Sequence, residues 1–85
     1  MSGFRVQTII DVITPLLRCE AFEAKLLDDA IDALEKVKAT IADEDESLVD
    51  KVDEIQDYLQ YLLAIEKPVV SEMKDELAAM LDDLQ

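Results

Sequence analysis

The fold is decided by residues 26–63, which read LLDDAIDALEKVKATIADEDESLVDKVDEIQDYLQYLL. Leucine, isoleucine and valine recur there every three or four residues, on both sides of the acidic run at residues 43–46. This spacing places the apolar side chains of each half on one face of an α-helix. The two faces can bury against each other only if the chain reverses between them. We therefore predict an antiparallel helical hairpin with an acidic tip.

The composition of the whole chain favours helices. Apolar residues make up 51% and charged residues 34% of the sequence, with one glycine, two prolines and no asparagine. Tight β-hairpin turns depend on glycine or asparagine, whereas helices need only caps. We predict an all-α protein of one domain, residues 1–85, folded as a small antiparallel bundle of three to four helices built on the central hairpin.

Pro15 interrupts the apolar segment that precedes the hairpin. Proline lacks the N–H that would bond back to Asp11, and Thr14 followed by proline also has the sequence of a helix start. We predict a short apolar helix over about residues 4–13, a break or kink at Thr14, and an acidic helical body over about residues 15–85.

The remaining boundaries follow from caps and prolines. The helix that ends near Ile41 either starts at the proline or begins after a second break around residues 18–21, and the apolar spacing leaves both options open. Ser47 resembles an N-cap and predicts the start of the next helix, which ends at about residues 65–66. Pro68 stops that helix and is expected to be the first residue of the last one.

The charge of the chain is strongly negative. Twenty-one acidic residues against eight basic ones give a net charge of −13. Such a field repels nucleic acid and anionic membranes, so we expect no direct contact with either and a basic protein as a possible partner. Residues 1–19 hold two bases and one acid, a net of +1, which leaves −14 for the rest. The chain thus has a nearly neutral apolar head and an acidic body.

The residue types argue against an enzyme. The chain has no histidine, no glycine-rich phosphate loop, and no serine or cysteine with a recognisable base partner. We expect no catalytic residues and no cofactor. Cys19 is alone, which rules out a disulfide within the chain and fits a reducing compartment. No secretory signal and no run of about 20 apolar residues is present, so the expected location is cytoplasmic.

Residues 43–54 have the ligand spacing of a calcium-binding EF-hand loop, with Glu54 at the last position. Two residues argue against that reading. Leu48 stands where the loop needs glycine for its sharp turn, and Lys51 would place a positive charge at the cation. The segment is better interpreted as a solvated helix start, and no metal site is predicted.

The function that we predict is a non-enzymatic protein–protein interaction module, such as an adaptor, a chaperone-like protein or an assembly subunit. The apolar head offers more aliphatic surface than one neighbouring helix can cover, so a partner protein or a second copy of the chain is expected to bury it. The predicted docking residues are Val6, Ile9, Ile10, Ile13, Leu17, Met73, Met80 and Leu84.

The alternative is an acidic inhibitor that imitates nucleic acid and binds a basic protein. A row of carboxylates on a rigid helix resembles DNA phosphates, although an ordinary solvated face has the same composition. The residues of this predicted acidic surface are Asp43, Asp45, Glu46, Asp50, Asp53 and Asp57. Tyr58 and Tyr61 lie nearby; we interpret both rings as filling the edge of the core, with a protein-binding edge as the alternative.

Overall fold

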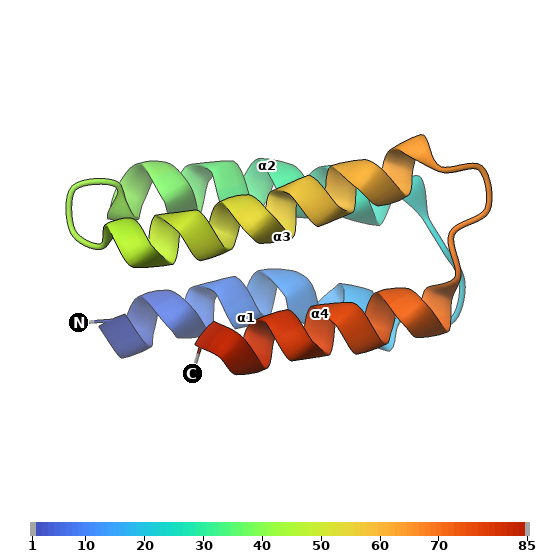
Figure 1. Ribbon diagram of the computed structural model, residues 1–85, viewed down its shortest axis with the longest axis horizontal. Helices are drawn as coiled ribbons and strands as arrows, with labels where there is room; N and C mark the ends of the chain where they lie inside the picture. Colours follow the sequence, from blue (N-terminus) through green and yellow to red (C-terminus); the bar gives the residue numbers. More distant parts are fainter. Residues whose placement is uncertain (1, 85) are drawn as a thin grey trace.

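The computed structural model describes the backbone of residues 2–84 and the side chains of residues 6–84. Within that range the chain forms four helices and no strand: α1 (Ser2–Arg18), α2 (Ala24–Ile41), α3 (Glu46–Ala64) and α4 (Val70–Leu84) (Figure 1). The predicted all-α bundle is confirmed, and α2 and α3 form its predicted antiparallel hairpin.

The helices run up and down in two layers, with α2 and α3 in one layer and α1 and α4 in the other (Figure 1). Each helix packs against two neighbours, in the cyclic order α1, α2, α3, α4. The bundle measures 37 × 20 × 16 Å. The acidic turn between α2 and α3 lies at the same end as the start of α1 and the end of α4, and the other two connections lie at the opposite end (Figure 1).

One apolar core runs through the ring of helices. Its largest fully enclosed side chains come from all four helices: Ile9, Ile13, Leu16, Leu27, Leu34, Ile41, Val52, Ile55, Leu59, Met73 and Leu77. Full burial of an aliphatic side chain of this size contributes about 1.5–3 kcal/mol relative to exposure. The apolar positions that the spacing in residues 26–63 predicts are therefore largely those that hold the hairpin together.

The predicted helix over residues 4–13 with a break at Thr14 is wrong, because α1 continues through Pro15 to its end. Pro15 lies on the exposed side of the helix, while Ile13 and Leu16 on either side of it are 0% and 1% exposed. A proline inside a helix costs about 3 kcal/mol, and the burial of two aliphatic side chains offsets that cost.

The chain breaks instead after Arg18, and residues 19–23 are not helical. The sulfhydryl group of Cys19 donates a hydrogen bond to the carbonyl of Leu16 (3.2 Å) at the end of α1. Glu23 then has the extended backbone of an N-cap at the start of α2. Of the two options that the sequence leaves open, the separate second helix is the one adopted.

The acidic turn places the N-cap of α3 at Asp45, two residues before the predicted cap Ser47. The amide of Asp45 donates to the carbonyl of Ile41 (3.0 Å) and closes the end of α2. The Oδ1 atom of Asp45 accepts a hydrogen bond from the amide of Leu48 (3.1 Å), so Asp45 is the N-cap, and Ser47 lies inside the helix. An aspartate side chain satisfies a free amide of the first turn, which is the reason for its preference at this position.

The connection between α3 and α4 differs from the prediction in a similar way. The last residue of α3 is Ala64, where the sequence predicts an end at residues 65–66. The amide of Met73 donates to the carbonyl of Val69 (3.0 Å), which places Val69 at the N-cap of α4. Pro68 therefore precedes the helix and is not its first residue.

Candidate protein-binding surfaces

The predicted apolar docking set is divided by the fold. Ile9, Ile13 and Met73 are 0% exposed and belong to the core, so the prediction that a partner contacts them is corrected. The reason is the ring arrangement, in which α1 packs against both α2 and α4. The other members are half-buried and pack against the core from its edge: Val6, Ile10, Leu17, Met80 and Leu84. Their docking role stays a prediction.

The predicted acidic set is also divided. Asp45 caps α3, and Asp53 is half-buried and pairs with Lys38 of α2. Asp43 is exposed in the turn between α2 and α3. Asp45 and Asp53 are therefore engaged in contacts within the fold, and Asp43 belongs to the turn and not to α3.

Three members of the acidic set do lie together. Glu46, Asp50 and Asp57 are exposed on the side of α3 opposite its buried residues, and Glu54, which the sequence analysis left out of the set, is exposed beside them. None of the four takes part in an ion pair with any side chain in residues 6–84. We call these four residues the outward acidic face of α3.

The calcium-loop spacing has no matching loop in the fold. Residues 46–54 form the first turns of α3, and Leu48 and Val52 within them are buried in the core. Across the described part of the chain, no group of three or more aspartate, glutamate, cysteine or histidine side chains is arranged to hold a metal ion.

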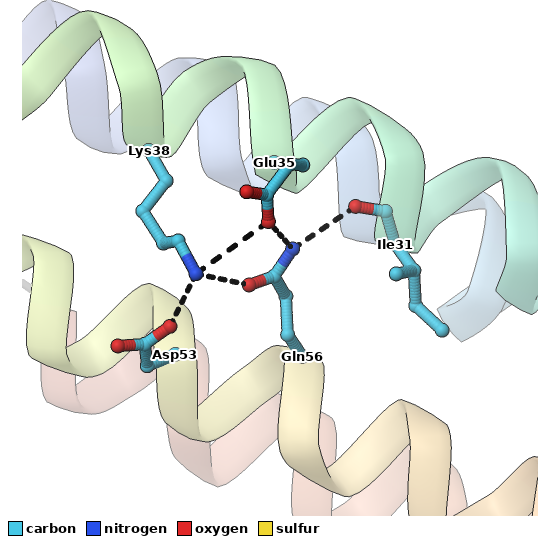
Figure 2. A network of polar contacts seen from close by, with 5 residues as sticks. All are labelled: Ile31, Glu35, Lys38, Asp53 and Gln56. Carbon is cyan, nitrogen blue, oxygen red and sulfur yellow. Dashed lines mark hydrogen bonds and ion pairs between the residues drawn. The ribbon is translucent and has the colours of Figure 1, made fainter.

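A polar network that the sequence analysis missed joins α2 to α3 (Figure 2). Gln56 is 5% exposed and is the one buried polar residue among the described side chains. Its Nε2 atom donates to the carbonyl of Ile31 and to Glu35 Oε2, both at 3.1 Å, and its Oε1 atom accepts from Lys38 Nζ at 2.9 Å. Buried polar groups need such partners, and here every polar atom of the amide has one.

Lys38 lies at the centre of this network. Its Nζ atom donates to Asp53 as well as to Gln56, and it lies 3.5 Å from Glu35 Oε2 (Figure 2). The hydrogen bond to Asp53 raises the pKa of Lys38 above 10.5, against the opposing effect of burial, and the charges of Asp53 and Glu35 raise it further. The sequence gives little indication of this network, because its only sign there is one glutamine, Gln56, next to the apolar positions of α3.

A hollow of about 240 Å³ lies between α3 and α4 and is open to solvent. Its lining residues are Lys51, Glu54, Glu76, Ala79, Met80 and Asp83. Lys51 Nζ donates to the backbone carbonyl of Asp83 (2.8 Å) and to its Oδ2 atom (2.9 Å). The last turn of α4 contains no base of its own, so Lys51 supplies the positive charge that favours a helix C-terminus.

Two tyrosine rings stack beside this hollow. The ring centroids of Tyr58 and Tyr61 are 6.3 Å apart, with an interplanar angle of 26°. Tyr58 is half-buried against the core, as predicted, whereas Tyr61 is 58% exposed and does not fill the core edge. Burial raises the pKa of Tyr58 above 10.0, and the negative charges of Glu76 and Glu72 on α4 raise it further.

Two further observations bear on function. No helix within residues 2–84 is long and apolar enough to cross a membrane. Comparisons with protein-family models, with curated proteins and with solved structures find no match to this chain.

Proposed function

We propose that this protein is a non-enzymatic interaction module that binds a partner with a basic surface through the outward acidic face of α3. The observation that carries the proposal is the arrangement of Glu46, Asp50, Glu54 and Asp57. They are exposed on one side of a single helix, and no described base pairs with them. The buried side of α3 is held in the core, so these carboxylates are presented on a rigid support.

The charge of the whole molecule supports the same proposal. A net charge of −13 on 85 residues attracts a basic partner over the Debye length, about 10 Å at 0.1 M salt. Oriented attraction of this kind raises association rates and discriminates against acidic partners. A basic surface is therefore the complement that this chain fits best.

Nucleic-acid-binding proteins are the class of basic partner that we favour. At 1.5 Å per residue, the outward acidic face extends over about 16 Å of helix axis. One strand of DNA carries a phosphate every 3.4 Å or so along its axis, so the row covers the length of about five phosphates. The protein would then act as an inhibitor that occupies a nucleic-acid-binding surface.

Docking through apolar residues is the second candidate. The half-buried side chains of Val6, Ile10 and Leu17 on α1, with Met80 and Leu84 on α4, favour it because a partner or a second copy could cover their exposed parts. We also propose a cytoplasmic location for this protein. Cys19 is a free thiol, and free thiols are typical of proteins in reducing compartments.

A pull-down from native lysate distinguishes the two candidates. We expect a basic nucleic-acid-binding protein to be retained at low salt and to be released by high salt or by added DNA. The triple variant E46Q/D50N/D57N should lose this partner, while D28N/D29N/D32N, which removes the same charge from exposed positions on α2, should keep it. Circular dichroism of both variants checks the fold.

A partner that resists high salt would contradict the acidic mode. If its binding were unaffected by E46Q/D50N/D57N and reduced by Ile10→Ser or Leu17→Ser in a folded protein, the edge of α1 and α4 would be the interface.

A further inference from the structure

The hollow lies between α3 and α4, and the tyrosine pair follows its lining residue Glu54 along the same side of α3. On α3, Glu54, Tyr58 and Tyr61 recur at intervals of four and three residues and share one side of the helix. On α4, Glu76 lines the hollow together with Glu54 of α3, and the charges of Glu76 and Glu72 act on Tyr58. We call this surface the α3–α4 groove and define it by the six lining residues of the hollow together with Tyr58, Tyr61 and Glu72.

The aromatic part of the groove is open to solvent. Among the described side chains, the exposed large hydrophobic residues are Tyr61, which is 58% exposed, and Val69, which is 50% exposed. The outer ring stacks on Tyr58, which is itself packed against the core, so its position is supported from one side. A supported ring with an exposed face attracts cations through its quadrupole.

The charges of the groove favour a cation as well. Glu54, Glu72, Glu76 and Asp83 are carboxylates, and Lys51 is the base among the defined groove residues. Lys51 already donates to the carbonyl and the carboxylate of Asp83. Glu54, Glu72 and Glu76 form no ion pair with a described side chain, and Glu54 precedes Tyr58 by one helical turn.

The size of the hollow indicates what kind of cation fits. Its volume of about 240 Å³ lies below the ~300–1,000 Å³ of most small-molecule sites, and it is open on one side. A free cofactor would keep much of its surface in water there. A single side chain on a larger partner would fill it, because the rest of the partner contributes to binding elsewhere.

We propose that the α3–α4 groove receives an arginine side chain presented by the basic partner, with the guanidinium stacked on Tyr61 and paired with Glu54, Glu72 or Glu76. This inference rests on the proposed function, since it names how that partner is held beside the outward acidic face of α3. Arginine fits better than lysine because its planar group stacks on aromatic rings and pairs with a carboxylate through two parallel hydrogen bonds.

The test uses two synthetic 12-residue peptides of equal charge, one alternating arginine with alanine and the other alternating lysine with alanine. Two-dimensional NMR of the ¹⁵N-labelled protein at about 0.15 M salt, where charges are screened beyond about 8 Å, locates and quantifies binding. We expect the arginine peptide to shift the amides of Tyr58, Tyr61 and Glu76 and to bind about two- to fivefold more tightly than the lysine peptide.

Variants of the groove sharpen the test. Tyr61→Leu should weaken binding of the arginine peptide by about two- to fivefold and remove the difference in affinity between the two peptides. Tyr61→Phe keeps the ring and should have neither effect. Val69→Ala is the control for loss of an exposed apolar side chain. The double variant E72Q/E76Q should weaken binding more than D28N/D29N, which removes the same charge from α2.

Three outcomes would overturn the inference. If both peptides bind with equal affinity, shift only the amide signals of the outward acidic face and bind Tyr61→Leu as they bind the wild type, the groove is not the site. The proposed function would then still stand. If tetramethylammonium binds the groove as tightly as the peptide, the site takes a small cation instead. If neither peptide shifts the protein anywhere and E46Q/D50N/D57N also captures every partner of the wild type, the proposed function fails together with the inference.

Discussion

At the residue scale, Gln56 aligns the two helices of the hairpin. Its amide bonds reach Ile31, Glu35 and Lys38 of α2, and a shift of α3 along α2 would break all of them. Replacement of Gln56 by alanine should lower the free energy of unfolding by about 1–2 kcal/mol, because it removes these bonds and leaves a cavity. Gln60→Ala on the exposed side of the same helix should change it by less than about 0.5 kcal/mol. Urea unfolding followed by circular dichroism measures both, and equal effects would contradict this role.

Tyr58 and Lys38 make the stability of the protein depend on alkaline pH. Both groups have a raised pKa in the folded protein, above 10.0 for Tyr58 and above 10.5 for Lys38. The unfolded chain therefore loses these protons first as the pH rises, so their stabilisation is complete below about pH 10 and is lost above it. Urea midpoints measured between pH 8 and pH 11 should fall above about pH 10 in the wild type and fall less steeply in Tyr58→Phe. An identical decline in the variant would show that Tyr58 does not contribute.

At the scale of the element, α1 contains a proline inside the helix, where proline destabilises the helical backbone. Pro15 is exposed, so its replacement by alanine removes no core contact. It also restores the backbone hydrogen bond from the amide of residue 15 to the carbonyl of Asp11. We expect Pro15→Ala to raise the free energy of unfolding by about 2 kcal/mol, which is the ~3 kcal/mol cost of an interior proline less the ~1 kcal/mol by which proline restricts the unfolded chain. Urea unfolding measures the gain, and Gln7→Ala on the same exposed side is the control. A loss of stability in the alanine variant would mean that α1 needs the proline for its packing.

The position of α1 also limits the apolar docking mode. Ile9 and Ile13 are enclosed between neighbouring helices, so an acidic substitution at either position would unfold the bundle and would not report on partner binding. The half-buried residues at its edge, such as Ile10 and Leu17, are the positions at which docking can be tested.

At the scale of the whole molecule, self-repulsion opposes the compact fold. Twenty-one acidic residues share a bundle of 37 × 20 × 16 Å, and the ion pairs among the side chains of residues 6–84 involve three of them, Glu35, Asp53 and Asp83. Sodium chloride should therefore raise the melting temperature between about 0.01 M and 1 M, a range over which the Debye length falls from about 30 Å to about 3 Å. Thermal unfolding by circular dichroism checks this, and D28N/D29N/D32N should show a smaller rise. A melting temperature that does not change with salt would mean that the carboxylates do not repel one another appreciably.

The sequence by itself determined the helical class, the hairpin and most of the core. Apolar residues at intervals of three and four can be buried together only on one face of a helix, and an acidic run between two such faces has to stay in water. The exposed carboxylates at Glu46, Asp50 and Asp57 follow from the same periodicity, because they occupy the side of α3 opposite its apolar positions.

Only the tertiary structure decided whether α1 passes through Pro15, which apolar residues are enclosed, and what lies beside Tyr61. Each of these depends on energies or neighbours that come from other helices. Burial of Ile13 and Leu16 offsets the cost of the proline, and α4 covers residues of α1 that the sequence leaves without a neighbour. The hollow brings Glu76 of α4 to Glu54 of α3, and the charges of Glu76 and Glu72 act on Tyr58. The spacing of apolar residues within one helix indicates which face of that helix is buried. It does not indicate which side chains of the other helices this face contacts.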